Sequence, residues 1–295
     1  MKRRQNSDYC LVCAVNISLI DAEQPTSLSS ENDAALMFCQ SCFDCREFSR
    51  GSWAVQSKCG DNALLMFMHY YGKYLANEKT RIETISEVKD KGDHLIDNAK
   101  EQELLLNLAN IYESGNMDSW MLYLYGIVLV KERMREEAIS VLLESIQSRP
   151  LFWGSWAELA NLIVDEEKLV SLKLPDCWLQ QLFRAEVYVK LHASDEAVDI
   201  LEPLLIDAPS VSPLSNWPSG LNQLAAAHYS STPPQLDRVL ELFEKIQAID
   251  PYRLDGLDLY SNTLFVKIFT TVRYMLVSNS AAENVEKAAV FFRTQ

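Results

Sequence analysis

Cysteines are the residues of this sequence whose spacing could bind a metal. Cys10-x-x-Cys13 and Cys39-x-x-Cys42 are spaced like paired thiolate ligands, and four thiolates are a common structural zinc site. Cys45 is a fifth candidate ligand. In the alternative interpretation, Cys39, Cys42 and Cys45 lie three residues apart along one helical face as small apolar core residues. The intervening segment lacks the turn-rich character of zinc knuckles, so we favour the core interpretation and expect no metal and no other cofactor.

Histidines and known catalytic motifs give no sign of an active site. His69, His94, His192 and His228 are scattered, and none has a carboxylate or Cys at metal-ligand spacing on a shared face. We expect His69 and His228, which lie in apolar stretches, to be interior residues. The sequence has no glycine-rich phosphate loop, no Gly-x-Ser-x-Gly elbow and no His-Glu-x-x-His motif. We therefore expect no catalytic residues, and a protein that is not an enzyme.

The elements that must position these side chains are predicted to be paired helices in a repeated pattern. Small residues and prolines recur at intervals of twelve residues: Gly126, Ala138 and Pro150 in one unit, and Ala185, Ala197 and Pro209 in another. Tetratricopeptide units of about 34 residues have this pattern, with small residues where two helices cross and a proline after the second helix. A larger side chain at the crossing would push the helix backbones apart. Proline lacks an N–H and ends the second helix.

Two further units are less regular. Trp156 and Ala160 begin one of them, and its second helix is expected to be cut short before Pro175. The other runs from Leu221 to Pro251, with Ala225 as its small residue. A single hairpin cannot bury its apolar face alone, so neighbouring hairpins must stack. The sequence therefore predicts an all-α protein, a tetratricopeptide-type α-solenoid of stacked antiparallel helix pairs.

The expected organisation along the chain has five parts. Residues 1–33 are expected to be poorly ordered or atypical. Residues 34–76 are expected to form N-terminal helical hairpins, with helices at 34–48 and 62–75. Residues 77–103 are charged and weakly periodic, which predicts a linker that is partly helical at most. Repeats are expected over 104–266 and atypical C-terminal helices over 267–295, where truncation is one interpretation.

Composition limits the classes of partner. The chain has 295 residues and a formal net charge of −14, which repels phosphate backbones, so we expect no binding to nucleic acid. No apolar stretch reaches the length of about 18 residues that a membrane helix needs, so no membrane span is expected. Seven unevenly spaced cysteines in a large chain are typical of reduced thiols. We expect the nucleus and cytoplasm as its location.

One known tetratricopeptide function is disfavoured by particular residues. Some members of the class bind the C-terminal carboxylate of a chaperone through Lys, Asn and Arg on their first helices. The corresponding positions here hold Tyr123, Ile127 and Glu158, which are not cationic. A generic tetratricopeptide adaptor that binds other peptides stays open as an alternative, because the repeat pattern alone is compatible with it.

Several short stretches, in order along residues 36–266, resemble the family of anaphase-promoting complex subunit 8, the cell division cycle protein 23 homologues. They are FDCREF at 43–48, MHYYGKYL at 68–75, YLYGIVL at 123–129, WGSWAEL at 153–159, LPDxW at 174–178 and DPYR at 250–253. The resemblance implies a structural subunit of a multisubunit ubiquitin ligase that controls mitotic progression. It further implies a homodimer formed by the N-terminal helices, stacking on other tetratricopeptide subunits, and catalysis by separate subunits.

The sequence departs from the family pattern near its end. It stops at Gln295, near the middle of the usual family length, residues 267–284 match poorly, and residues 286–292 resemble a later family helix. A skipped exon, an error in the gene model or a true short isoform would each give this pattern. We therefore do not expect binding of the co-activator, which the resemblance assigns to C-terminal units, whereas dimerisation is still expected.

Overall fold

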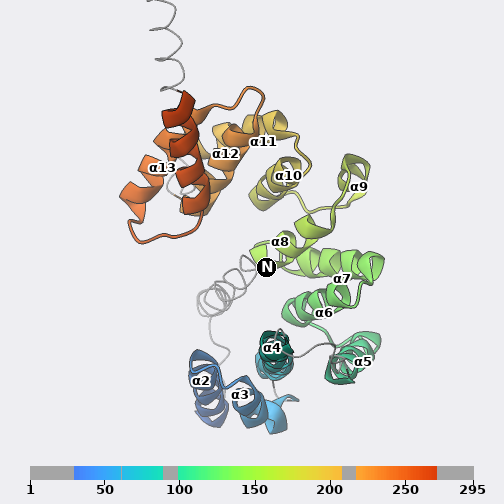
Figure 1. Ribbon diagram of the computed structural model, residues 1–295. Helices are drawn as coiled ribbons and strands as arrows, with labels where there is room; N and C mark the ends of the chain where they lie inside the picture. Colours follow the sequence, from blue (N-terminus) through green and yellow to red (C-terminus); the bar gives the residue numbers. More distant parts are fainter. Residues whose placement is uncertain (1–29, 61, 89–98, 208–216, 271–295) are drawn as a thin grey trace, which may run out of the picture. The chain divides into compact units, whose positions relative to one another are not determined.

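A computed structural model describes residues 30–60, 62–88, 99–207 and 217–270 (Figure 1). Over these ranges the regular elements are helices, and no strand occurs among them. The prediction of an all-α protein is therefore confirmed. Predictions that fall on residues 1–29 and 271–295, and those for Cys10, Cys13, His94 and Pro209, lie outside the described residues.

The chain divides into two compact units. The first comprises Met1–Leu162 with Lys173–Pro175, and the second comprises Ile163–Leu172 with Asp176–Gln295. Within each unit, consecutive helices pair and the pairs pack on one another, as a stacked helical repeat requires.

The first unit begins with α2 (Ser30–Asp44), α3 (Phe48–Val55) and α4 (Ala63–Val88). The prediction of a single helix over 34–48 is wrong at its C-terminal end. Arg46 has a φ of 59°, in the left-handed region that ends helices, and the Glu47 N–H donates to the Cys42 carbonyl at 2.8 Å. This turn separates α2 from α3.

The small core between these three helices forms around Phe43, which is 6% exposed. Its ring meets Phe48 edge-on with centroids 5.6 Å apart. A Cβ on Gly51 would lie 2.8 Å from the Phe43 ring, and a Cβ on Gly72 would lie 3.0 Å from it. The missing side chains therefore let α3 and α4 close on the same ring.

Helices extend into both ends of the predicted linker over 77–103, which was expected to be partly helical at most. Helix α4 continues without a break to Val88, and α5 (Ala99–Glu113) begins inside the same stretch. The physical reason is that charged residues of this stretch pair with one another and with α6, which comes later in the chain. Local periodicity does not show such pairing. Residues 89–98 lie outside the described residues, so the linker stays a prediction.

The clearest repeat is formed by α6 (Ser119–Lys131) and α7 (Arg135–Ser148). Asp118 caps α6 by accepting a hydrogen bond from the Met121 N–H at 2.9 Å. Helix α6 packs against α4, α5, α7 and α8, which explains why it is apolar around most of its circumference. Its first-half residues are all buried: Trp120, Met121, Leu122, Tyr123 and Leu124.

Helix α8 (Trp153–Leu162) packs on α7 and is the last helix of the first unit. Trp156 is fully buried, and its indole Nε1 donates to the Pro150 carbonyl at 2.8 Å. The turn after α7 is thereby fixed to the helix that follows.

The second unit repeats the hairpin arrangement. Its helices are α9 (Glu166–Ser171), α10 (Trp178–Lys190), α11 (Ser194–Glu202), α12 (Pro218–Ser230), α13 (Leu236–Ile249) and a helix over 257–270. A π-helical turn, Pro203–Asp207, continues α11. Helix α10 pairs with α11, α12 pairs with α13, and α11 packs against α12, so the two hairpins stack. As predicted, the helix before Pro175 is short, with six residues.

Candidate interaction surfaces

The predicted small positions lie deep inside the helix pairs. Each of the alanines proposed as a crossing residue is at most 1% exposed: Ala138, Ala160, Ala185, Ala197 and Ala225. Gly126 faces α7, where a Cβ would lie 2.7 Å from Cγ and Cδ2 of Leu142. The side chain that excludes a larger residue at Gly126 is therefore Leu142, one helical turn beyond Ala138.

The predicted prolines follow helix ends. Pro150 comes two residues after the last residue of α7, and Pro251 comes two residues after the last residue of α13. Both helices end with the same kind of hydrogen bond, from the Arg149 N–H to the Ser145 carbonyl and from the Asp250 N–H to the Ile246 carbonyl, each 2.9 Å long. These junctions start the turn into the next element.

Cysteines in the described ranges take three different environments. Cys39 is fully buried in α2 and Cys42 is 5% exposed, whereas Cys45 lies beyond the end of α2 and is exposed. Burial raises the pKa of the Cys39 thiol to about 12, and the neighbouring Cys42 adds to that rise. A neutral thiol packs as a small apolar group. The core interpretation therefore holds for Cys39 and Cys42 and is wrong for Cys45, because the helix ends before that residue.

The two histidines predicted to be interior are buried. His69 is 5% exposed, and its Nδ1 lies 3.1 Å from Ser52 Oγ and 2.9 Å from the Ser52 carbonyl. His228 is 1% exposed, with Nε2 at 3.4 Å from Glu202 Oε1. Burial lowers the pKa of both imidazoles. Across the described ranges, no group of three or more His, Cys, Asp or Glu side chains is placed to hold a metal ion.

None of the described helices is both long and apolar enough to cross a bilayer.

The structure also shows where the residues at the chaperone-clamp positions lie. Tyr123 is 2% exposed and packs edge-on against Phe152 with centroids 4.9 Å apart, so its side chain belongs to the core. Ile127 and Glu158 are half-buried.

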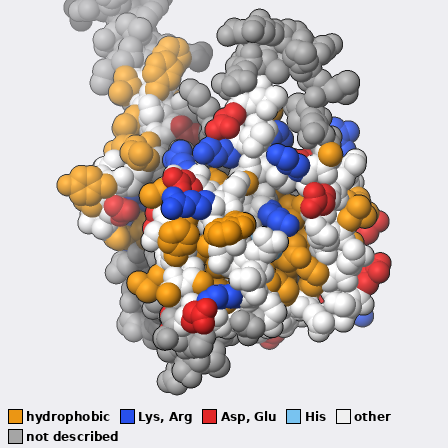
Figure 2. All heavy atoms as spheres, turned by 90° about the horizontal axis from the view of Figure 1, so that it is seen from below, with side chains coloured by type: hydrophobic (Ala, Val, Ile, Leu, Met, Phe, Trp, Pro, Cys, Tyr) orange, Lys and Arg blue, Asp and Glu red, His pale blue; other side chains and the backbone are white. Residues whose placement is uncertain are grey.

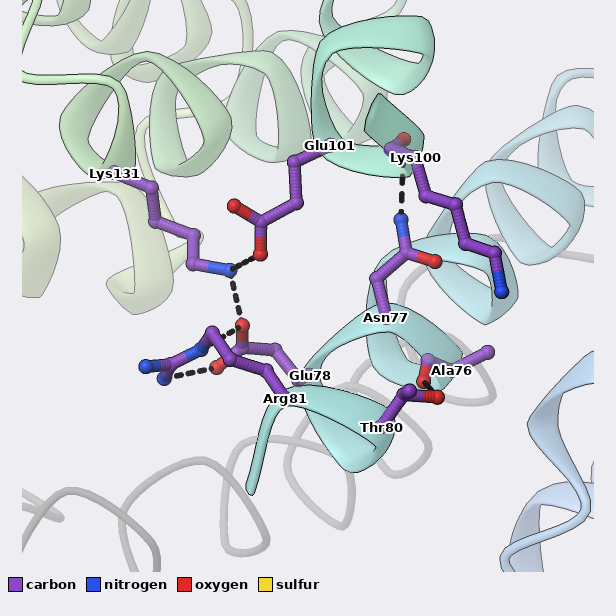
Figure 3. A network of polar contacts seen from close by, with 8 residues as sticks. All are labelled: Ala76, Asn77, Glu78, Thr80, Arg81, Lys100, Glu101 and Lys131. Atoms are coloured by element: carbon purple, nitrogen blue, oxygen red, sulfur yellow. Dashed lines mark hydrogen bonds and ion pairs between the residues drawn. The ribbon is translucent and has the colours of Figure 1, made fainter. Parts of the chain in front are cut away.

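Charged side chains join α4 to α5 and α6 in a polar network (Figure 3). Arg81 pairs with both oxygens of Glu78, with Nε at 3.0 Å from Oε1 and Nη2 at 2.9 Å from Oε2. Lys131 of α6 donates to Glu78 and also to Glu101 of α5, 3.2 Å from its Oε1. One ammonium thus connects three helices. In the same view, the Asn77 amide donates to the Lys100 carbonyl at 3.3 Å.

The electrostatics of this network favour the charged form of Glu78. Burial alone raises the pKa of its carboxyl, but hydrogen bonds from Arg81 and Lys131 outweigh burial and lower the pKa overall. The Lys131 ammonium also lies 5.0 Å from the centroid of the Tyr74 ring. Sequence reasoning missed this network. Only the Glu78–Arg81 spacing was a visible signal, since Lys131 is far away in the sequence.

A surface of α2 and α3 carries large apolar side chains in contact with water. We call Met37, Phe38 and Trp53 the N-terminal apolar surface; they are 67%, 44% and 74% exposed. The Arg50 guanidinium lies 5.3 Å from the centroid of the Phe38 ring, so residues from both helices meet there. Figure 2 looks from the side where α2, α3 and α5 lie in Figure 1, and hydrophobic side chains gather there beside Lys and Arg.

A groove of about 350 Å³ lies next to this surface, between the start of α3 and the second half of α4. Its lining mixes both signs of charge: Arg46, Arg50 and Lys79 with Glu47 and Glu83. Arg50 is itself paired with Glu47 at 2.8 Å. This balance selects no particular class of ligand, and the apolar side chains beside the groove are the stronger indication of a binding surface.

The fold places the chain among all-α proteins made of stacked helix hairpins. The family model described as Anaphase promoting complex subunit 8 / Cdc23 matches residues 11–207. This chain belongs to that family, in agreement with the resemblance found in its sequence.

Curated relatives give the same result over most of the chain. The cell division cycle protein 23 homolog of Homo sapiens is 32% identical over 249 residues, which is 83% of this chain and 40% of the relative. Anaphase-promoting complex subunit 8 of Arabidopsis thaliana is 31% identical over 298 residues, which is 92% of this chain and 49% of the relative. The chain therefore spans less than half the length of these relatives.

A solved structure also resembles the chain, but only weakly. The protein YrrB, described as a TPR protein with an unusual peptide-binding site, is 13% identical, and the match covers 77% of this chain and 90% of that one. The TM-score of the match is 0.35.

Proposed function

We propose that this chain is a non-catalytic scaffold subunit of the anaphase-promoting complex, a multisubunit ubiquitin ligase that controls mitotic progression. The observation that carries the proposal is the family match over residues 11–207, together with relatives named for this complex. We also propose the nucleus and cytoplasm, expected from the sequence, as its location.

Two kinds of contact would give the scaffold its role. The first is a homodimer through the N-terminal helices, supported by the 74% exposure of Trp53 and the 67% exposure of Met37. Large side chains exposed together are favourable only where a partner covers them. The second is stacking on other tetratricopeptide subunits, supported by the helix hairpins of this chain, since repeat units bury their apolar faces against neighbouring units.

Co-purification from dividing cells tests membership of the complex. The full chain, tagged and expressed at its natural level, is expected to recover other subunits of the complex. The matched control is Gly126→Leu, which should disturb the α6–α7 pair and reduce that recovery. Recovery of the intact chain with peptide-bearing clients but without ligase subunits would contradict the proposal and favour the adaptor alternative.

A further inference from the structure

A buried histidine lies where α11, α12 and α13 meet. His228 is 1% exposed, and among the described residues neither of its ring nitrogens has a hydrogen-bond partner of good geometry. Its main chain is fixed, because its carbonyl accepts hydrogen bonds from Ser231 Oγ at 2.8 Å and from the Gln235 N–H at 3.0 Å. A buried polar group without a partner destabilises a fold unless it has another role, so the charges around this ring are the place to look for one.

One carboxylate oxygen lies between this ring and an arginine. Glu202 of α11 has its Oε1 atom 3.4 Å from His228 Nε2, and Arg238 of α13 has its Nη2 atom 3.6 Å from the same oxygen. The guanidinium is always charged, whereas the imidazole gains its charge only when it takes up a proton. Arg238 also has a second partner, because its Nη1 donates to Glu241 Oε2 at 2.9 Å. Arg238 therefore stays paired even if Glu202 turns to the histidine.

Other charged side chains of the elements around α12 pair with one another. They are Glu186 with Lys190 on α10, Arg253 with Asp255 on the turn after α13, and Asp237 of α13 with Lys267. The first two pairs contact the first half of α12, at Gln223 and Ser219, whereas His228 lies in its last turn. Burial lowers the pKa of the ring, the nearby carboxylate of α11 raises it, and the guanidinium of α13 lowers it, with a net lowering.

We propose that His228, Glu202 and Arg238 form a proton-operated switch, in which protonation of His228 moves Glu202 from Arg238 to the histidine. With a neutral ring, Glu202 links α11 directly to α13. A proton taken from solvent turns the ring into a buried cation next to the carboxylate, where an ion pair is screened less than at the surface. The direct link between α11 and α13 is then lost, and a link between α11 and α12 replaces it.

The same balance gives the direction of the pH effect. Because the pKa of the His228 ring is lower in the folded chain than in the unfolded chain, the unfolded chain binds more protons between the two values. The stability that comes from the neutral ring is present above the pKa of an unfolded histidine and is lost as pH falls towards the folded value. The second unit should therefore loosen on mild acidification. This switch belongs to the fold of the chain and does not depend on membership of the anaphase-promoting complex.

NMR of the histidine rings in the full chain, between about pH 8 and pH 5, tests the proposal. His228→Gln removes one ring signal and so assigns it, and His228→Asn serves if that variant does not fold. The signal should titrate at a lower pH than in the urea-unfolded chain. Glu202→Gln should lower its midpoint further, whereas Arg238→Gln should raise it. Glu196→Gln and Lys245→Gln change the same charges elsewhere on α11 and α13 and should leave the midpoint unchanged.

Urea unfolding measures the exchange of partners. At about pH 7.5 the losses of stability from Glu202→Gln and Arg238→Gln should be less than additive, because the two side chains interact. Below the midpoint measured for His228 the losses should become additive, unless His228 is itself replaced by Gln. The proposal is overturned if His228 titrates as it does in urea or only together with the carboxyl groups, or if both charge variants move its midpoint the same way. A coupling between Glu202 and Arg238 that does not change with pH also overturns it.

Discussion

At the scale of single residues, Gly126 decides how closely α6 and α7 pack. A Cβ there would lie 2.7 Å from the Leu142 side chain, so Gly126→Leu must displace a residue that is itself fully buried. We expect a loss of about 1–3 kcal/mol in the free energy of unfolding, the usual cost of overpacking a core. Urea denaturation measures it. Gly60→Leu is the matched control, because no atom lies within 4 Å of a Cβ built on Gly60. Equal midpoints for the two variants would show that the helices are not packed as described.

Glu78 gives the residue-scale prediction for pH. Its pKa is lower in the folded chain than in the unfolded chain, so its pairing stabilises the fold above the pKa of an unfolded glutamate and is lost as pH falls through the lower, folded value. Glu78→Gln should therefore reduce stability at pH 7 by about 1–3 kcal/mol, the cost of leaving Lys131 and Arg81 without their carboxylate. The difference from the unsubstituted chain should shrink as pH falls towards 3.

Thermal unfolding of both proteins between pH 7 and pH 3 measures this change. Glu47→Gln is the matched control, since the Glu47–Arg50 pair at 2.8 Å is half exposed and screened by water. A gap between Glu78→Gln and the unsubstituted chain that stays constant over the whole pH range would contradict a role for the ionised carboxylate.

At the scale of elements, the sequence predicted best what is local. The helix pairs α6–α7 and α10–α11 follow from small residues twelve positions apart, because both helices of a pair are encoded within one stretch of chain. The end of α2 was missed because Arg46 takes a positive φ of 59°. Glycine normally adopts this conformation, so an arginine at the position does not indicate a helix end.

The length of α4 was missed because its second half is too polar to look amphipathic. Contacts between residues far apart in the sequence, such as that from Lys131 of α6 to Glu78, stabilise it instead. The candidate interaction surface was also hidden, because exposure of Met37 and Trp53 depends on which helix faces point inwards. Periodicity finds apolar residues but does not say which of them remain uncovered.

At the scale of the whole molecule, charge and apolar exposure act in opposite directions. A net charge of −14 makes two copies repel each other, whereas the N-terminal apolar surface favours their association. The apolar contact must outweigh the repulsion for a dimer to form at micromolar concentration. Added salt screens the repulsion and leaves apolar burial in place. A dimer of this kind should therefore become tighter between about 50 mM and 300 mM NaCl, the opposite of an association held by ion pairs.

The dimer itself is the last prediction. We expect the full chain to be a dimer at micromolar concentration, and Trp53→Asp to raise its dissociation constant by about thirtyfold or more, because truncating a central aromatic residue typically costs about 2 kcal/mol. Sedimentation equilibrium at two salt concentrations measures both effects. Leu106→Asp, on α5 and 64% exposed, is the matched control and should leave the dimer intact. If the chain is monomeric, or if Leu106→Asp weakens association as much as Trp53→Asp does, the N-terminal apolar surface is not the interface. The exposed side chains of α2 and α3 would then need a partner other than a second copy of the chain to cover them.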